Sequence, residues 1–445
     1  MASVSMISEN HSHENEMTGL QKLGLALFSI GLLVLLVSFG GVGANQPLLF
    51  FGLSIGLTTV GGVMYIYPKK RLLPGIKNNH IWFKSMTSRG AVAWMTGVLF
   101  TGFYVLLYWF PGTLEHWIRL ADPLSMLLTG SAANQWFLYG LFYTLAVLVM
   151  GLRMIVFKYR HNRYQIIRTL SVMFFQLGFA FLLPNFLRLL NQPEFYFTYF
   201  WPLKYSYLFP NDVNWLMSQP GGLGVFMVFW GAIMSFIATP VLTYFYGKRW
   251  YCSWVCGCGG LAETLGDPYR QLSDKSLTAW KIERWMIHSV LVFITITTAA
   301  LWINSATNGQ MLGSLSNSFS STYGFLIGAV FSGVIGVGFY PVMGSRVWCR
   351  FGCPMAAVLG IIQKKFSRFR ITTNGSQCIS CGNCSTYCEM GIDVRWYAQR
   401  EQNIIRASCV GCGVCAAVCP RGVLKLENSK PGDRYNLVLD DQLIQ

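Results

Sequence analysis

All thirteen cysteines of this 445-residue chain lie between Cys252 and Cys419, and eight of them form two short runs. The runs read CISCGNCSTYC at 378–388 and CVGCGVCAAVC at 409–419. Each has the spacing C-x2-C-x2-C-x3-C, in which three thiolates surround one iron–sulfur cube and the fourth ligates the other cube. The two runs therefore predict one folding unit that holds two [4Fe–4S] clusters.

By this rule the ligands divide between the two runs. The first cluster takes Cys378, Cys381, Cys384 and Cys419, and the second takes Cys409, Cys412, Cys415 and Cys388. Gly382, Gly411 and Gly413 suit a close approach of the backbone to a cluster. Structural zinc is the alternative, but four-cysteine zinc sites rarely carry all their ligands in so compact a run, and here the run occurs twice. Pro420 follows the second run, whereas Glu389 follows the first.

Another set of cysteines follows two hydrophobic stretches. The segments GKRWYCSWVC at 247–256 and GSRVWCRFGC at 344–353 align without a gap, which indicates an internal repeat. Cysteines four apart on a helix share a face, so each segment offers two thiolates. Two such helix ends meeting at the membrane surface would supply four ligands for a third metal centre, namely Cys252, Cys256, Cys349 and Cys353.

Arginines in the repeat, Arg249, Arg346 and Arg350, would help to balance the negative charge of such a centre. The alternative is two pairs of free interfacial thiols packed among aromatic residues, because buried cysteine is also an ordinary small hydrophobic residue. Cys258 is the remaining cysteine. It fits a substitute ligand, a reactive thiol or a filler of the core, and we expect a filler.

The elements that position these cysteines are set by the composition of the chain, which is 53% hydrophobic and only 12% charged. Runs long enough to cross a hydrocarbon core of about 30 Å recur along most of its length, and only helices span lipid as open elements. The predicted spans are 19–41, 47–68, 90–110, 136–157, 167–190, 223–247, 285–303 and 323–343. We expect a membrane all-α bundle of about eight transmembrane helices.

The net charge of +16 follows the positive-inside rule. Basic residues fill the second and fourth connections, with Lys69, Lys70, Arg71, Lys77, Lys84 and Arg89 in one and Lys158, Arg160, Arg163 and Arg168 in the other. The alternate connections carry only Arg119 and Lys204. This pattern predicts a multi-pass protein of the bacterial inner membrane with both termini cytoplasmic. It argues against nucleic-acid binding, since no soluble segment assembles a basic and aromatic surface.

The predicted organisation has five parts. A cytoplasmic disordered tail at 1–18 precedes spans one to five with a periplasmic loop at 19–222, and spans six to eight with both cysteine repeats follow at 223–370. A cytoplasmic α+β ferredoxin domain of the bacterial two-cluster type occupies 371–428, and a second tail occupies 429–445. Thiols stay reduced in the cytoplasm, so disulfides are not expected.

Three further features of the spans invite interpretation. His288 begins the seventh predicted span near the third cysteine set, where it fits a quinone or proton site, although interfacial packing is the simpler reading. Arg153 and Arg188 lie near span ends, where we expect them to snorkel to the headgroups. The aromatic stretch 194–205 fits a membrane-interface belt or a docking surface for a periplasmic partner, and we expect the belt.

The paired cysteine repeats and the two-cluster ferredoxin motif over about 223–428 resemble the membrane polyferredoxins of the NapH, NosR and CcoG type. Gly257 departs from the family, which usually has proline after Cys256. The resemblance implies quinol oxidation, or passage of electrons to periplasmic reductases and metal-centre maturation. We therefore expect an electron-transfer subunit of an oxidoreductase that relays electrons between a cytoplasmic or quinone donor and a membrane or periplasmic redox partner. The alternative is a redox-sensing or metal-centre assembly factor.

Overall fold

The computed structural model describes residues 17–68 and 89–428. The chain divides into two compact units, Met1–Pro74 with Phe110–Tyr139 and Gly75–Trp109 with Gly140–Gln445, and each is described by itself. The predicted tails at 1–18 and 429–445 lie outside the described residues, apart from positions 17 and 18. The same is true of most of the basic residues predicted for the second connection, of which only Arg89 is described.

Eight helices of the described residues are long and apolar enough to cross a membrane, which confirms the predicted number of spans. They run Gly19–Phe39, Pro47–Ile66, Ala91–Trp109, Gln135–Lys158, Arg163–Leu189, Leu223–Tyr246, Leu277–Ala306 and Leu315–Ile335. The seventh starts before the predicted residue 285, because the Ser276 side chain caps it by accepting the Ala279 N–H at 3.1 Å. The eighth was predicted at 323–343 and lies about eight residues earlier, since its first turns are serine-rich and hid its start.

The first unit contains the spans α2 (Gly19–Phe39) and α3 (Pro47–Ile66), which pack as an antiparallel hairpin. Short helices η3 (Pro111–Leu114), α5 (Glu115–Leu120) and α6 (Asp122–Thr129) complete it. Glycines line the contact between α2 and α3: a side chain at Gly61 would overlap the Phe28 backbone and the Gly24 carbonyl. Small residues let membrane helices approach closely in this way.

The second unit holds the other six spans, several of which contain a π-helical turn. They are built from α4 (Ala91–Trp109), α7 (Gln135–Arg153) with η4 (Met154–Lys158), α8 (Arg163–Phe174) with η5 (Phe175–Leu182) and α9 (Leu183–Leu189), α11 (Leu223–Ile233) with η6 (Met234–Ala238) and α12 (Thr239–Tyr246), α15 (Leu277–Ala306), and α16 (Leu315–Tyr323) with η8 (Gly324–Ile335). A short helix, α10 (Pro210–Met217), precedes α11.

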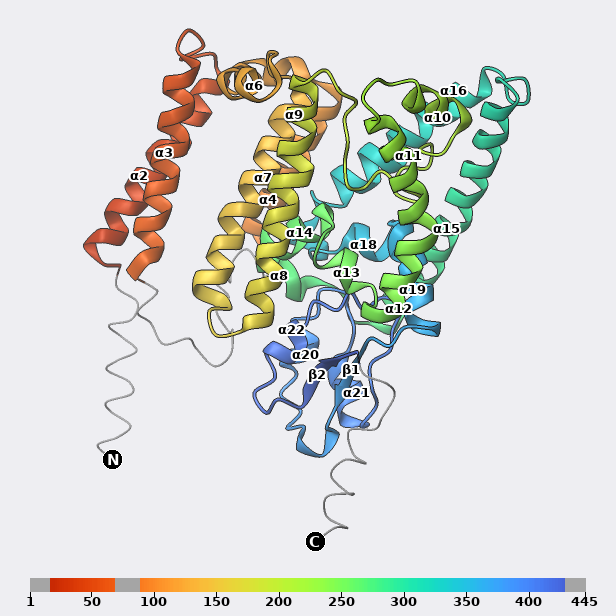
Figure 1. Ribbon diagram of the computed structural model, residues 1–445. Coiled ribbons are helices and arrows are strands. Elements are labelled where there is room, and N and C mark those ends of the chain that lie inside the picture. The colour runs from red at the N-terminus through yellow and green to blue at the C-terminus, as the bar shows by residue number, and fades with distance from the viewer. Residues whose placement is uncertain (1–16, 69–88, 429–445) are drawn as a thin grey trace. The chain divides into compact units, whose positions relative to one another are not determined.

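The aromatic stretch 194–205 is not an interface belt, and that expectation was wrong. The connection from α9 to α10 turns back into the bundle and descends between α9 and α11 (Figure 1). Phe200 is completely buried and stacks edge-on against Tyr251 at a centroid distance of 5.9 Å. Trp201 donates its backbone N–H to Ser235 Oγ and its indole N–H to Thr298 Oγ1. Non-helical backbone is tolerated at membrane depth only where protein surrounds it in this way.

The cysteine repeat has the same local fold in both copies. In the first copy α12 is followed by α13 (Arg249–Cys252) and α14 (Gly257–Thr264), and in the second α17 (Tyr340–Met343) is followed by α18 (Val347–Phe351) and α19 (Pro354–Lys365). Gly247 and Gly344 take positive φ values of 66° and 93° at the break before each cysteine helix. The 3-10 helix η7 (Asp267–Leu272) follows α14.

The ferredoxin fold occupies the end of the second unit. Strand β1 (Arg370–Thr373) pairs antiparallel with β2 (Leu424–Glu427), so that Arg370 faces Glu427 and Thr373 faces Leu424. Between the strands lie η9 (Gly375–Gln377) and the short helices α20 (Asn383–Thr386), α21 (Val394–Gln399) and α22 (Val414–Ala417). The fold packs at the ends of α8, α12 and α19 (Figure 1).

Candidate metal centres and their surroundings

The four thiols of the repeat meet in one buried place. Cys252, Cys349 and Cys353 are at most 8% exposed. Burial raises the pKa of the Cys353 thiol well above its usual value, and the nearby Cys349, Cys252 and Cys256 raise it further. The structure thus brings together all four residues that the repeat predicted, from segments far apart in the chain.

The two cysteines of each repeat do not lie on one continuous helix, which corrects the predicted spacing argument. Cys252 ends α13 and Cys256 is the N-cap of α14. Cys349 lies in the middle of α18 and Cys353 is the N-cap of α19. Pro354 at the first position of α19 forces the second break, because proline starts helices but cannot continue them. The turns leave both thiols of each pair directed at the same site.

Cys258 lies beside this set. Its thiol hydrogen-bonds to Cys256 and lowers the Cys256 pKa to about 6. The hydrogen bond with Cys256 raises the Cys258 pKa well above its usual value, and burial and the nearby Cys256, Cys349 and Cys353 raise it further. Part of the side chain still reaches the protein surface. Cys258 is therefore a fifth thiol next to the four, and not a filler of an unrelated part of the core.

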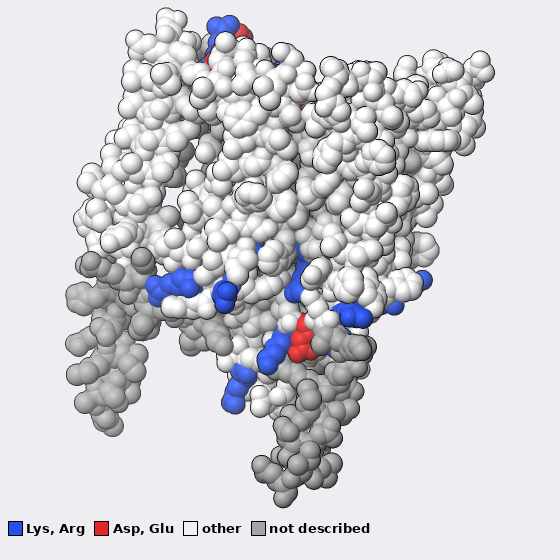
Figure 2. All heavy atoms as spheres, in the orientation of Figure 1, with Lys and Arg blue, Asp and Glu red and all other residues white. Residues whose placement is uncertain are grey.

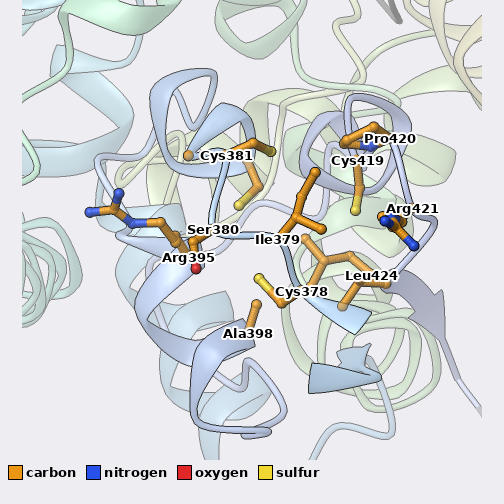
Figure 3. Close-up of a pocket in the computed structure, with 13 residues that line it drawn as sticks. Cys378, Ile379, Ser380, Cys381, Arg395, Ala398, Cys419, Pro420, Arg421 and Leu424 are labelled. Carbon is orange, nitrogen blue, oxygen red and sulfur yellow. The ribbon is translucent and has the colours of Figure 1, made fainter. Parts of the chain in front are cut away.

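The first ferredoxin set forms the wall of a pocket at the end of the fold remote from the spans. Cys378, Cys381, Cys384 and Cys419 all line it, together with Ile379. The labelled sulfur atoms of Cys378, Cys381 and Cys419 point toward a common space around Ile379 (Figure 3). Burial raises the pKa of Cys384 to about 12, and the Cys419 and Cys381 thiols add to the rise. Cys381 is exposed, so this set faces the surroundings.

The second ferredoxin set is more deeply placed. Burial raises the pKa of Cys415 well above its usual value, and Cys412, Cys409 and Cys388 raise it further. Cys384 of the first set also contributes, so the two ferredoxin sets are within electrostatic reach of each other. Cys388 of the first run thus lies close to the thiols of the second run, as the ligand assignment from the spacing predicted.

The chemistry of these donors fits iron–sulfur clusters. Each set offers four sulfur atoms, and four free thiolates side by side would repel one another, a conflict that bound cationic iron removes. Gly382, Gly411 and Gly413 all adopt left-handed φ angles, between 64° and 77°, in the loops that carry the cysteines. A Cβ atom on Gly411 would lie 2.7 Å from the Cβ atom of Arg249, so this loop also needs glycine to approach the membrane helices.

Direct hydrogen bonds join the second ferredoxin set to the cysteine repeat. Ser253, next to Cys252, donates to the Val410 carbonyl at 2.8 Å, and Val410 is next to Cys409. Gln363 on α19 donates to the Arg406 and Cys409 carbonyls, each at 2.8 Å. Four more donors reach this loop or Glu389, namely Lys248 to Ala407, Tyr164 to Gly411, Gln165 to Cys412 and Ser273 to Glu389. The backbone carbonyl oxygens of the loop thus accept hydrogen bonds from side chains of the cysteine repeat, α8 and α19, and these bonds hold the loop in place.

A buried ion-pair network also lies between the ferredoxin fold and the spans, and the sequence did not predict it. Arg346 pairs with Glu263 at 2.5 Å and with Glu389 at 3.0 Å, and it also donates to the Cys349 sulfur at 3.7 Å. Glu263 pairs in addition with Arg168. Arg346 thus connects a thiol of the repeat with the residue that follows Cys388.

Asp267 is the second anionic focus of the network. It accepts from Lys158 at 2.6 Å and lies 3.3 Å from Arg270 and 3.8 Å from Arg153. Burial by itself would raise the pKa of Asp267, but Lys158, Arg270 and Arg153 together lower it to about 2. Arg153 is 7% exposed, so the expectation that it snorkels to the headgroups was wrong. Arg188 is exposed, as snorkelling requires.

Glu389 explains one departure of the sequence from a symmetric ferredoxin motif. It stands where Pro420 stands in the second run, and it is only 1% exposed. It pairs with Arg270 at 2.9 Å as well as with Arg346. Glu263, Glu389 and Cys412 offer ligand atoms within 4.8 Å of one another. Both carboxylates are already paired with arginines, so the geometry is that of a charge network and not of a cation site.

His288 lies on α15 and is exposed. Its Nδ1 atom is 2.5 Å from the Arg284 carbonyl oxygen, which leaves Nε2 for another partner. It lines a pocket of about 290 Å³ that Cys349 also lines. The structure thus places His288 on the same pocket as a thiol of the third cysteine set.

The fold and these thiol sets define a multi-pass membrane protein with ferredoxin-type iron–sulfur sites. Two family models agree. A 4Fe-4S binding domain matches residues 226–276 and 325–372, which contain one cysteine repeat each. A 4Fe-4S dicluster domain matches residues 370–420, which contain the two ferredoxin runs.

Curated relatives point the same way. The chain is 25% identical over 169 residues to the Escherichia coli (strain K12) protein named "Putative electron transport protein YccM", which covers 36% of this chain and 46% of the relative. It is 25% identical over 163 residues to an uncharacterized protein of Methanocaldococcus jannaschii, covering 36% and 59%. The chain thus spans about half the length of the curated relatives that it matches. No solved structure matches it. Together these findings indicate a membrane protein with 4Fe-4S binding domains.

Proposed function

We propose that this protein relays electrons through three [4Fe–4S] clusters, from a soluble cytoplasmic donor to a membrane quinone or a periplasmic acceptor, or in the reverse direction. The ligands are the two ferredoxin sets and the set Cys252, Cys256, Cys349 and Cys353. Such clusters take up and release single electrons at potentials set by charge, hydrogen bonds to sulfur and burial. The chain is placed in the bacterial inner membrane with its termini and ferredoxin fold in the cytoplasm, as the positive-inside rule expects.

One observation carries the proposal: the Ser253 side chain bonds the Val410 carbonyl, so residues adjacent to Cys252 and Cys409 touch. Electron tunnelling weakens steeply with distance, and this contact keeps the third set next to the second. The first set is the exposed one and suits exchange with a soluble partner. The second set is therefore a neighbour of both the exposed first set and the third set.

Positively charged residues next to the third cysteine set stabilise negative charge on its sulfur atoms. Arg346 donates to the Cys349 sulfur. Burial raises the pKa of Cys252 to about 12, and the positive charge of Lys248 limits this rise. Positive groups and donors to sulfur favour the more negative, reduced state of a cluster. Of the two roles expected for His288, a quinone site or a proton site, we propose the proton site, because His288 is exposed on the pocket shared with Cys349.

The test is anaerobic iron and acid-labile sulfide analysis with redox-poised EPR on the purified full chain. Wild type is expected to hold about twelve iron atoms and the Cys252→Ser/Cys349→Ser variant about eight, since each cube holds four. Cys258→Ser is the matched control and should keep about twelve. If wild type and the double variant both hold about eight, the third set binds no cluster, the relay is refuted, and a sensing or assembly role gains support.

A further inference from the structure

The pocket shared by His288 and Cys349 has an unusual lining. Most of its lining comes from three segments: the start of α15, the helix α19 with the residues just before it, and the ferredoxin loop at 405–408. Lys248, Met390 and Tyr397 complete it. We call it the basic pocket. Its positively charged residues are Lys248, Arg284, Arg350, Lys364, Lys365 and Arg406. Glu283 is its one acidic residue, so the lining carries five more positive than negative charges at neutral pH.

Most of these cations have no acidic partner in the part of the chain that the structure describes. There, the ion pair at the pocket is Arg350 to Glu283 at 2.7 Å. Arg284 and Arg406 instead lie against the ring of Trp280, 5.3 and 4.9 Å from its centroid. Such contacts hold a guanidinium in place without neutralising it. The pocket therefore holds fixed positive charges that suit an anionic ligand.

The pocket also lies at the depth of lipid headgroups. Helix α15 has 30 residues and is about 45 Å long, which exceeds the hydrocarbon core of about 30 Å. Its charged residues, Lys281, Glu283 and Arg284, all lie near its start, which favours the first turns as the part outside the lipid tails. Apolar side chains beside the pocket are open to the surroundings: Ile282 is 48%, Trp285 76% and Phe366 64% exposed. Tryptophan beside lysine and arginine is typical of the membrane interface. On the face shown in Figure 2, Lys and Arg gather below a broad region that is almost free of charged residues.

We propose that the basic pocket binds the phosphate headgroup of an anionic membrane phospholipid. Basic pockets beside membrane helices are known to hold such headgroups, and arginine matches the geometry of phosphate oxygens. A volume of about 290 Å³ is at the lower end for ligand sites, which suits a headgroup and is too small for a dinucleotide. A neutral quinone ring would leave the excess positive charge unused. The proposal does not depend on whether any cysteine set binds iron.

The test uses the full chain purified in detergent and titrated with phosphatidylglycerol or phosphatidylcholine, with bound lipids counted by native mass spectrometry. Wild type should bind phosphatidylglycerol more tightly than phosphatidylcholine. Each cation near an anionic headgroup is worth about fivefold in affinity, so Lys364→Gln/Lys365→Gln should weaken phosphatidylglycerol binding about 25-fold. Arg284→Gln, on a different helix, should weaken it about fivefold and provides a second variant if the first does not fold.

The matched control is Lys281→Gln/Arg163→Gln, which also removes two exposed positive charges but from residues that do not line the pocket. If the pocket and not the net charge sets the affinity, this variant should bind phosphatidylglycerol with an affinity within about twofold of that of wild type. Equal losses in the pocket and control variants would overturn the proposal. Displacement of phosphatidylglycerol by an equal concentration of inorganic phosphate, or of a short-chain ubiquinone, would also overturn it, because the pocket would then take that ligand instead.

Discussion

Removing the charge of Asp267 should destabilise the protein far more than removing the charge of an exposed carboxylate. Asp267→Asn keeps the size of the side chain but leaves Lys158, Arg270 and Arg153 without their shared anion. The Asp267 side chain is 3% exposed, so water cannot replace the lost charge. Breaking a buried pair by removing one partner costs about 3–5 kcal/mol.

The pKa of Asp267 supplies an independent estimate. A fall from 3.8 to about 2 means that the folded protein favours the charged form by roughly 2.5 kcal/mol. Asparagine resembles the protonated acid. The roughly 2.5 kcal/mol is therefore a lower bound on the stability lost in Asp267→Asn, and it is close to the 3–5 kcal/mol given above. For a chain of 445 residues an unfolding entropy of about 2.1 cal/mol/K per residue converts 3–5 kcal/mol into a decrease of about 3–5 °C in Tm.

The assay is thermal unfolding in detergent, followed by intrinsic tryptophan fluorescence. Glu115→Gln is the control, because Glu115 pairs with Arg119 at the surface, where the side chains are 55% and 57% exposed. Exposed pairs contribute about 0–1 kcal/mol, so its Tm should fall by about 1 °C or less. Equal decreases in the two variants would show that the Asp267 network contributes no more than a surface pair.

Two further predictions concern acid stability and helix packing. The folded pKa of Asp267 lies below its unfolded value, so its contribution is complete above about pH 4 and is lost as the pH falls from about 4 to about 2. The difference in Tm between wild type and Asp267→Asn should therefore be constant from pH 5 to 7 and shrink at pH 3, and a constant difference at all pH values would contradict this. Gly61→Leu should lower Tm by several degrees, because the side chain would separate α2 from α3. Gly56→Leu on the same helix meets no atom within 4 Å and should leave Tm unchanged, so equal effects would argue against close packing at Gly61.

Local patterns predicted much of this architecture. The eight spans were readable because each is a continuous apolar run, and the ferredoxin ligands were readable because each run of cysteines is compact. The cysteine repeat was found by its gapless alignment. Its geometry was predicted less well: the helix breaks at Gly257 and Pro354, so the thiols converge through turns and not through one helical face.

The misplaced features depend on contacts between distant residues. Aromatic residues around Phe200 have the composition of an interface belt, and only the packing against Tyr251 shows that they are inside. The ion network joins Arg153 and Arg346 through carboxylates far away in the chain, and no spacing rule connects such residues. Glu389 in place of proline was the one local signal, because an acidic residue there is costly unless a cation is buried with it.

The divided ligand sets have a consequence for biogenesis. On the proposed assignments, the thiols of the membrane-proximal set are complete once Cys353 has been synthesised, whereas the first ferredoxin set must wait for Cys419, close to the end of the chain. The loop that holds Val410 then closes over Ser253 and the buried thiols beside it. On these assignments, iron has its most direct access to the membrane-proximal thiols before the ferredoxin fold docks over them.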